Sequence, residues 1–213
     1  YITTNVSKDS YGSKLDNGPA PSYLSEGTKY YSYDGHYFYT YSNFDSMISD
    51  YNNGTRTNSV NPNSPYFNYY QYLPLRSKTN YSASEMNDMI NAKTDSDSKM
   101  RNIGNDLVTD KNPYRVNALI MTGLAANESS WGSSNIAQSK NNLFGLNAVD
   151  SSPGESANYY SDVATCIKDF AETYMSKRYL RSGYTYYKGA FLGNKASGIN
   201  VHYASDPYWG EKA

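Results

Sequence analysis

The chain has 213 residues, which suits one domain or one domain with a sizeable extension and is enough to bury a hydrophobic core. Its 19 basic and 20 acidic side chains leave a formal charge of −1, so no overall field indicates nucleic acid or an anionic membrane as partner. It contains no apolar run of about 18 residues and no signal-peptide pattern. We therefore expect no membrane insertion, with any export signal outside this sequence or already removed.

The cysteine and histidine content gives no sign of a metal centre. Cys166 is the sole cysteine and lies on an apolar helical stripe, so we expect a buried, unreactive thiol rather than a nucleophile. The two histidines, His36 and His202, belong to no cluster with metal-ligand spacing, and both are interpreted as structural. We expect no metal and no cofactor.

Tyrosine is unusually abundant, with 25 Tyr against 6 Phe and 2 Trp. A tyrosine ring has a flat apolar face and a polar tip, which suits the C–H faces and hydroxyl edges of sugar rings. The plainer interpretation is that this protein uses Tyr where others use Phe. We expect only a few tyrosines to contact a ligand.

The N-terminal part of the chain predicts little regular structure apart from one hairpin. Residues 1–27 lack a sustained period and are interpreted as a loop-like arm. Within residues 28–41, two aromatic runs flank Asp34-Gly35, a dipeptide that suits a two-residue hairpin turn. Such a turn predicts these facing pairs: Tyr33 with His36, Tyr31 with Phe38, and Tyr30 with Tyr39.

The next segments predict short helices separated by loop. We expect a helix from Phe44 to Tyr51 that stops at Asn52-Asn53-Gly54, and then an ordered loop over residues 55–80. A capping box at Ser82 to Glu85 predicts a helix with Met86, Met89 and Ile90 on one face. A further helix is predicted from Asp97 to Val108.

The most apolar stretch begins at Tyr114, where Val116, Ile120 and Leu124 recur at helical spacing after a possible start at Asn112-Pro113. Glu128 follows Leu124 by one helical turn and therefore lies on the apolar stripe. Two interpretations are open. The carboxylate bends back to water or to the Ser129–Gly132 region, or apolar surroundings keep it protonated so that it can donate a proton near neutral pH.

The remaining segments predict a strand, a connection and a helix. Asn141-Asn142-Leu143-Phe144-Gly145-Leu146 is interpreted as a turn that enters a short strand, and residues 147–158 as a turn-rich connection or hairpin tip. Asp162 caps a helix with a stripe of Val163, Ile167, Phe170 and Tyr174. The basic residues Lys177, Arg178 and Arg181 suit the negative end of its dipole.

Three separated motifs, AANESSWGSS, NNLFGL and HYASDPYWGEKA, occur in an order that resembles glycoside hydrolase family 73, the endo-β-N-acetylglucosaminidases of bacterial cell-wall autolysins. The resemblance covers roughly residues 98–213. It implies an α+β, mainly helical, lysozyme-like fold with two lobes, a helical lobe that contains Glu128 and a small β lobe after Leu146. We expect an N-terminal extension, residues 1–83, with its hairpin packed on a catalytic domain, residues 84–213.

The resemblance also implies a reaction and its residues. Glu128 is the expected general acid in hydrolysis of the bond between N-acetylglucosamine and N-acetylmuramic acid. For the second catalytic role, Glu155 is the candidate base of an inverting reaction, with Asp150 as a weaker rival. If the substrate's own N-acetyl carbonyl acts as nucleophile instead, no protein base is needed, and Tyr203 helps to position that acetamido group.

Five residues in the family motifs are candidates for substrate binding: Tyr203, Asn141, Phe144, Trp131 and Asp206. Packing in the core explains Phe144 and Trp131 equally well, and Asp206 before Pro207 also suits a simple turn.

The expected partner is the glycan strand of peptidoglycan, bound by a monomer that is secreted or associated with the cell wall. One alternative is a muramidase or lytic transglycosylase, which uses a single glutamate in a similar fold. The other is a wall-binding module without catalysis, because the aromatic hairpin resembles choline-binding repeats. Only one copy is present, however, and such modules work as arrays.

Overall fold

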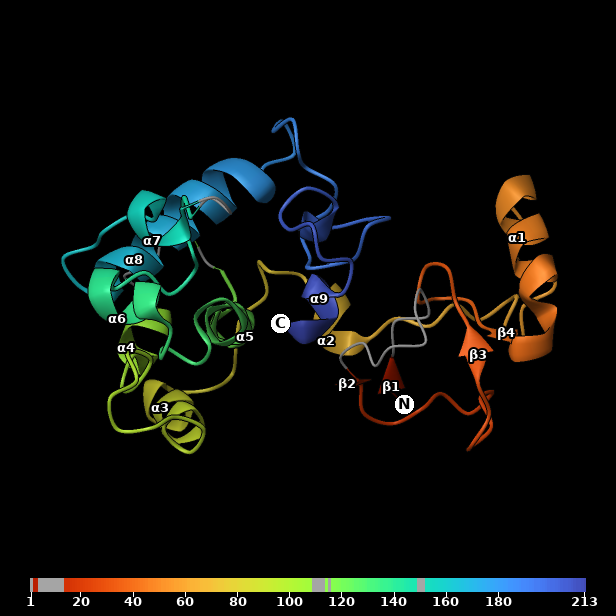
Figure 1. The fold of residues 1–213 in the computed structure, drawn as a ribbon, viewed down its shortest axis with the longest axis horizontal. Coiled ribbons are helices and arrows are strands. Elements are labelled where there is room, and N and C mark those ends of the chain that lie inside the picture. Colours follow the sequence, from red (N-terminus) through yellow and green to blue (C-terminus); the bar gives the residue numbers. More distant parts are fainter. Residues whose placement is uncertain (1, 4–13, 109–113, 115, 149–151) are drawn as a thin grey trace.

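The computed structural model describes residues 2–3, 14–108, 114, 116–148 and 152–213. The described chain is mainly helical, and its strands form two small antiparallel sheets in the N-terminal part. In Figure 1, the helices from α3 (Ala83–Asn91) to α8 (Val163–Asp169) lie together on one side, and α2 (Tyr69–Tyr72) and α9 (Trp209–Lys212) lie in the middle. The second sheet and α1 (Phe44–Asn53) lie on the other side. No helix in the described residues is long and apolar enough to cross a membrane.

The N-terminal arm contains a sheet that the sequence analysis did not predict. Strand β1 (Ile2–Thr3) pairs with β2 (Leu15–Asp16), so that Ile2 faces Asp16 and Thr3 faces Leu15. The prediction of a loop without strands over residues 1–27 is therefore wrong for these four residues. The pairing joins segments more than ten residues apart, which local periodicity cannot reveal.

The predicted hairpin is present, but its register is shifted by one residue. Strands β3 (Tyr30–Tyr31) and β4 (Tyr39–Thr40) pair with Tyr30 facing Thr40 and Tyr31 facing Tyr39. The pairs predicted from a two-residue turn are therefore wrong. The Asp34 carboxylate accepts the N–H groups of both His36 and Tyr37, at 2.9 and 3.1 Å, and these bonds support a wider loop.

Side-chain contacts place His36 away from its predicted cross-strand partner. Its ring packs on Phe67 and Tyr72, with centroid distances of 4.4 and 4.9 Å, and its Nδ1 lies 2.6 Å from the carbonyl oxygen of Tyr66. His202, in turn, packs against Tyr186. Each histidine thus packs against aromatic residues that are distant from it in the sequence.

After the short 3-10 turn η1 (Tyr41–Asn43), helix α1 (Phe44–Asn53) ends where the sequence predicts. Gly54 has a φ of 67°, and its N–H donates to the carbonyl oxygens of Asp50 and Tyr51, which closes the helix. The expected loop over residues 55–80 contains one short helix, α2 (Tyr69–Tyr72).

Helix α2 joins the N-terminal part to the C-terminal segment. The side-chain amide of Gln71 donates to the Gly193 carbonyl at 2.9 Å, and the Gly193 N–H donates to the Gln71 carbonyl at 3.0 Å. Beside them the Leu75 N–H donates to the Ala190 carbonyl at 2.8 Å. The segment around α2 is thereby hydrogen-bonded to the segment that precedes α9 (Trp209–Lys212), and the two helices lie together in Figure 1.

Helix α3 (Ala83–Asn91) has the predicted capping box: Ser82 accepts the Glu85 N–H, and the Glu85 carboxylate accepts the Ser82 N–H. Met86 and Ile90 are buried, whereas Met89 is 38% exposed. Helix α4 (Gly104–Val108) is much shorter than the predicted helix from Asp97, because the residues before it form turns.

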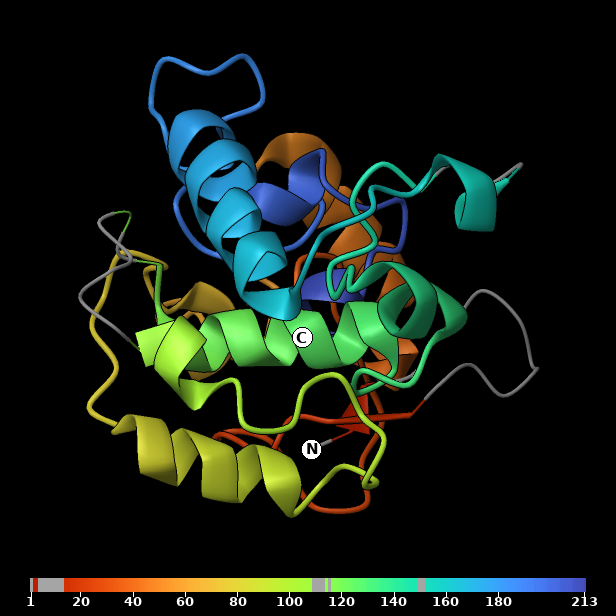
Figure 2. The same ribbon diagram turned by 90° about the vertical axis from the view of Figure 1, so that its left-hand side faces the viewer.

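Helix α5 (Ala118–Ser129) lies between α3 and the α8–η2 helix, as Figure 2 shows. It is capped by Asn117, whose side chain accepts the Ile120 N–H at 3.1 Å, so the predicted start near Asn112-Pro113 is wrong; those two residues lie outside the described ones. Most α5 side chains are buried around the whole circumference, as expected for a helix inside a core.

The segment after helix α6 (Asn135–Lys140) is a buried turn, so the predicted strand over residues 141–146 is wrong. The Asn142 side chain is the reason: its oxygen accepts the N–H groups of Phe144 and Leu146, and its amide donates to the Leu146 carbonyl. These bonds replace strand pairing. The described residues 147–148 and 152–162, where the β lobe was expected, contain no strand. Where a hairpin tip was expected, the short helix α7 (Pro153–Ser156) is present.

Helix α8 (Val163–Asp169) begins at the predicted cap, because the Asp162 carboxylate accepts the Thr165 N–H at 2.7 Å. It continues as the π-helical segment η2 (Phe170–Tyr179). The Phe170 ring stacks on Phe144 at 3.7 Å, which joins this helix to the core. The 3-10 turn η3 (Ile199–Val201) and helix α9 (Trp209–Lys212) complete the chain.

Candidate active site

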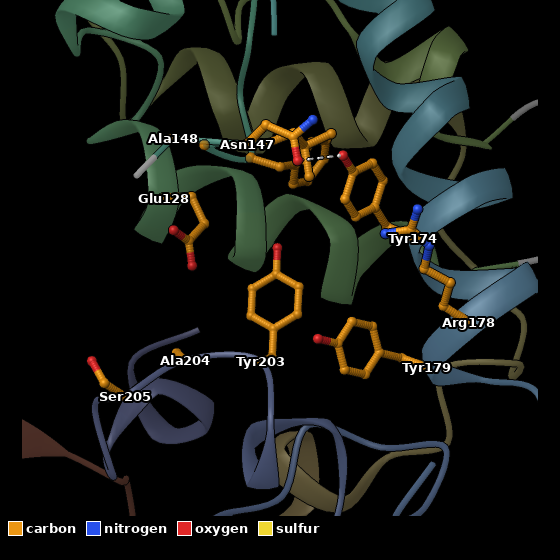
Figure 3. A pocket seen from close by; sticks show the side chains of 12 residues that line it. Glu128, Asn147, Ala148, Tyr174, Arg178, Tyr179, Tyr203, Ala204 and Ser205 are labelled. Atoms are coloured by element: carbon orange, nitrogen blue, oxygen red, sulfur yellow. Dashed lines mark hydrogen bonds between the residues drawn. The ribbon is translucent and has the colours of Figure 1, made fainter. Parts of the chain in front are cut away.

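A pocket of about 520 Å³ lies where the end of α5, the Asn142 turn, η2 and the segment after η3 meet (Figure 3). Twelve described residues line it. They are Glu128, Phe144, Gly145, Leu146, Asn147, Ala148, Tyr174, Arg178, Tyr179, Tyr203, Ala204 and Ser205. Elements far apart in the sequence therefore build this site.

Glu128 is the only carboxylic acid among these twelve residues. It lies in the last turn of α5, and its Oε1 accepts a hydrogen bond of 2.5 Å from the indole N–H of Trp209. Burial raises the pKa of Glu128 above its ordinary value, and hydrogen bonds from Trp209 and Asn127 offset part of this rise. These surroundings favour a carboxyl group that keeps its proton closer to neutral pH.

The turn after Glu128 is held in an unusual backbone conformation. Ser130, Trp131 and Gly132 have positive φ values of 50°, 56° and 79° in succession. The Ser129 hydroxyl accepts the Gly132 N–H at 2.8 Å and donates to the Ala125 carbonyl at 2.6 Å. A β-carbon at Gly132 would lie 2.7 Å from the Met100 nitrogen, so this close packing requires glycine. The turn thus fixes the end of the helix that carries Glu128.

Tyr203 lies on the wall of the pocket that faces Glu128 (Figure 3). Its ring packs against Trp209 and Tyr179, with centroid distances of 4.6 and 5.4 Å. Burial, followed by the charge of Glu128, raises the pKa of Tyr203 well above its ordinary value. Its hydroxyl is therefore protonated, and within the described part of the chain it has no hydrogen-bond partner.

The third wall comes from η2. The Tyr174 hydroxyl donates to the Asn147 side chain at 3.3 Å, drawn as a dashed line in Figure 3. The Arg178 guanidinium lies 4.8 Å from the centre of the Tyr174 ring. Arg178 is the only cation among the lining residues, and it forms no ion pair within the described ranges. From the sequence, Arg178 was predicted only to interact with the helix dipole, and its place in the pocket was not predicted. The signal that could have indicated it is the four-residue spacing of Tyr174 and Arg178, which puts both side chains on one face of the helix.

The structure brings together three of the seven predicted site residues: Glu128, Phe144 and Tyr203. Phe144 is only 2% exposed and stacks on Phe170, so it belongs to the core as much as to the pocket. Trp131 is 40% exposed and is not among the lining residues.

Asn141 and Asp206 are also absent from the pocket lining, and their side chains bind backbone instead. Asn141 caps α6 and donates to the Tyr160 carbonyl at 3.0 Å. Asp206 accepts the Tyr208 N–H at 2.9 Å and pairs with Lys212. Direct substrate contact by these two residues therefore has no support in the pocket geometry, because their polar atoms are used to hold the chain.

Glu155, the candidate base, is not among the residues that surround Glu128 in the pocket. Glu155 is exposed on α7 and does not line the pocket, and the carbonyl oxygen of the same residue accepts from Lys140. Asp150 lies outside the described residues.

The described residues contain no group of three His, Cys, Asp or Glu side chains arranged to hold a metal ion. Cys166 is fully buried, and burial raises the pKa of its thiol to about 12. The thiol is therefore unreactive, as the sequence predicts.

Two curated relatives resemble most of this chain. Both are named putative endo-beta-N-acetylglucosaminidase and come from Streptococcus pneumoniae, serotype 4 strain TIGR4 and strain R6. Each is 38% identical over 193 residues, which is 86% of this chain. The chain spans only 28% and 27% of the length of these relatives.

Solved structures show the same fold at lower identity. Autolysin E of S. aureus matches with a TM-score of 0.53 and 23% identity over 68% of each chain. A catalytic mutant of that protein, solved with the disaccharide NAG-NAM, matches with a TM-score of 0.52 and 21% identity over 67% of this chain and 68% of the other. The α+β, mainly helical, lysozyme-like fold is thus confirmed.

The family model of the glucosaminidases, described as mannosyl-glycoprotein endo-beta-N-acetylglucosaminidase, matches residues 104–213. This range contains α4 to α9 and every residue that lines the pocket. The chain therefore belongs to the glucosaminidase family, glycoside hydrolase family 73.

Proposed function

We propose that this chain is an endo-β-N-acetylglucosaminidase that hydrolyses the β-1,4 bond between N-acetylglucosamine and N-acetylmuramic acid in peptidoglycan. The observation that carries the proposal is the half-buried Glu128 carboxyl, which faces the Tyr203 hydroxyl across the pocket. The names of the streptococcal relatives support the reaction, and the NAG-NAM complex of Autolysin E supports the substrate. In that complex the catalytic mutant has alanine in place of a glutamate.

Glu128 acts as the general acid in this proposal. It gives its proton to the glycosidic oxygen while the bond from that oxygen to the anomeric carbon breaks. Because the pKa of Glu128 is raised, the protonated form persists to higher pH than for an exposed glutamate. Activity is therefore lost as the pH rises through that raised pKa.

For the second role, we propose that the N-acetyl carbonyl oxygen of the substrate attacks the anomeric carbon. Water then opens the resulting ring and gives a proton to the Glu128 carboxylate, which restores the acid. The Tyr203 hydroxyl supports this assignment, because it lines the pocket, has no hydrogen-bond partner among the described residues and can donate to an acetamido oxygen. This route retains the anomeric configuration, whereas Glu155 acting as base would invert it. Proton NMR of the first product anomer separates the two.

We also propose that residues 84–213 form the catalytic domain and that residues 1–83 form an extension packed on it. The hydrogen bonds of Gln71 and Leu75 to the C-terminal segment support this arrangement. The resemblance to autolysins supports action outside the cell, on the wall. We propose that the protein acts there as a monomer.

Mass spectrometry of the new reducing ends after digestion of purified peptidoglycan tests the proposal. N-acetylglucosamine reducing ends are expected. Muramic or anhydromuramic ends would instead indicate a muramidase or a lytic transglycosylase. A chain that binds sacculi but clears no zone in a zymogram would be a wall-binding module without catalysis.

Replacing Tyr203 with phenylalanine is expected to reduce kcat about ten- to a hundredfold and to change KM little. The ring still packs on Trp209, but one hydrogen bond to developing charge is lost, at a cost of about 1.5–3 kcal/mol. Steady-state kinetics on a soluble glycan fragment measures both constants. An unchanged kcat would remove Tyr203 from the mechanism.

Replacing Arg178 with glutamine is expected to weaken binding of fragments whose muramic acid carries no stem peptide about tenfold, because the free lactyl carboxylate would lose the one cation among the lining residues. Binding of an uncharged N-acetylglucosamine oligomer is expected to change much less. Calorimetry with both ligands gives the comparison, and Arg181→Gln, an exposed arginine that does not line the pocket, is the matched control. Equal losses for both ligands would contradict recognition of the carboxylate.

A further inference from the structure

Trp209 reaches Glu128 from a segment 81 residues later in the chain. It is the first residue of α9 and is 3% exposed. Its indole nitrogen is a donor and has no acceptor capacity, so the Oε1 atom of Glu128 accepts this bond in both protonation states.

The other carboxyl oxygen borders the pocket. Gly145 lines the pocket, and a β-carbon built on it would lie 3.8 Å from Oε2 of Glu128. Apart from the residues next to Gly145 in the chain, no other atom would lie within 4 Å of that β-carbon. The two oxygens of Glu128 therefore have different surroundings.

We infer that Trp209 is a positioning residue that holds the Glu128 carboxyl in one orientation, with Oε1 bound to the indole and the transferable proton on Oε2. This inference rests on the proposed role of Glu128 as general acid. Trp209 itself does not line the pocket, so its effect passes through Glu128.

The surroundings of Trp209 hold the indole in place. The Tyr203 ring packs on it at 4.6 Å, and the backbone N–H of Trp209 donates to the Asp206 carbonyl at 3.3 Å. The buried Asn200 amide donates to the carbonyl oxygens of Asp206 and Pro207, at 3.1 and 3.2 Å. The backbone of Asp206 thus helps to hold Trp209 in place. This gives Asp206, in the HYASDPYWGEKA motif, a role that needs no substrate contact.

Close packing on the next residue adds to this support. A β-carbon at Gly210 would lie 2.1 Å from the Gly193 carbonyl oxygen, so α9 lies directly against that loop. The Gly193 backbone is itself bonded to Gln71 of α2. The N-terminal part of the chain therefore helps to fix the position of Trp209.

The indole has a defined effect on the titration of Glu128. Its hydrogen bond stabilises the carboxylate and so lowers the pKa of Glu128 relative to burial alone. The titratable or charged groups on the walls that face Glu128 are Tyr203 from the segment after η3, and Tyr174, Arg178 and Tyr179 from η2. Phenylalanine at position 209 keeps an aromatic ring against Tyr203 and removes only the indole N–H. Loss of that hydrogen bond is therefore expected to raise the pKa of Glu128.

Replacing Trp209 with phenylalanine tests this inference. We expect kcat to fall about ten- to a hundredfold with little change in KM, because the acid loses its orientation. We also expect the alkaline limb of the pH profile of kcat to move to higher pH. A purely structural role predicts lower activity from unfolding or loose packing, without that upward movement. The inference would be overturned if the variant has the circular dichroism spectrum of the native protein and its alkaline limb stays at the same pH or moves to lower pH.

A second measurement does not depend on activity. The chain has two tryptophans, so labelling with ¹⁵N gives two indole signals. We expect the Trp209 signal to shift as Glu128 titrates and to stop shifting in Glu128→Gln, while the exposed Trp131 signal serves as internal reference. A Trp209 signal that ignores the Glu128 titration would overturn the inference even if peptidoglycan is cleaved. If the protein hydrolyses no peptidoglycan but the Trp209 indole signal still shifts as Glu128 titrates, the proposed function is wrong and the hydrogen bond between Trp209 and Glu128 is supported.

Discussion

Replacing Glu128 with glutamine is expected to abolish hydrolysis, with kcat reduced at least about a thousandfold, because the amide has no acidic proton to give to the glycosidic oxygen. Glutamine has nearly the same shape, and its side-chain oxygen can still accept the indole N–H of Trp209. The fold and the affinity for glycan should therefore persist. Release of reducing ends from purified peptidoglycan, together with glycan binding, measures both properties.

The matched control for this experiment is Glu155→Gln. Glu155 is exposed and does not line the pocket, so the substrate-assisted route predicts a small change in kcat. A loss as large as that of Glu128→Gln would favour Glu155 as the base of an inverting reaction. Hydrolysis that survives Glu128→Gln would remove the central residue of the proposed mechanism.

Replacing Asp50 with alanine is expected to lower the free energy of unfolding by about 3 kcal/mol, because the buried Tyr39 hydroxyl and several part-buried donors lose their shared acceptor. Asp50 is 2% exposed and lies in α1. Its carboxylate accepts from the Tyr39 hydroxyl at 3.0 Å, the Thr55 hydroxyl at 2.8 Å, and both the backbone and side-chain nitrogens of Asn58 at 2.8 and 2.9 Å. It thereby joins the hairpin, the helix and the following loop.

Thermal unfolding followed by circular dichroism gives the measurement, with a decrease in Tm of about 6–12 °C expected for a chain of this size. Asp45→Ala is the control, because Asp45 is exposed on the same helix and should cost less than about 1 kcal/mol. Similar losses for Asp45→Ala and Asp50→Ala would show that the hydrogen-bond network contributes little.

The same carboxylate predicts a dependence of stability on pH. Burial raises the pKa of Asp50, but hydrogen bonds from Asn58, Thr55 and Tyr39 outweigh burial and lower the pKa to about 2. Because the folded value lies below the unfolded one, the stability from Asp50 is present above about pH 4 and is lost as the pH falls toward 2. Asp50→Ala should therefore flatten the pH dependence of stability in that window.

Where local chemistry decides, the sequence predicted the structure well. The capping box at Ser82, the cap at Asp162 and the stop at Gly54 all lie where expected, because each depends on bonds within a few residues. The reversal of the chain around Asp34-Gly35 was also predicted, but the two-residue turn and its register were not, because the Asp34 carboxylate accepts the N–H groups of His36 and Tyr37 in a wider loop.

Predictions that depended on distant partners failed or were incomplete. The apolar run from Leu143 to Leu146 suggested a strand, yet the buried Asn142 side chain satisfies its backbone and leaves no need for a pairing partner. Residues 97–108 suggested a longer helix, yet the buried Met100 lies in a turn whose backbone packs against Gly132. In both places apolar residues are in the core, as the pattern indicated, but in a different backbone conformation.

The sequence by itself determined the family, the acidic residue at the end of the buried helix and most local helix boundaries, because these follow from motif order, helical spacing and caps. Only the tertiary structure decided which side chains surround Glu128. Trp209, Tyr203 and the η2 wall come from later segments, up to 81 residues away in the sequence, and packing brings their atoms together. A linear pattern reports which face of a helix is buried but not which distant side chain covers it. The orientation of the carboxyl and the walls of the pocket are therefore properties of the folded chain.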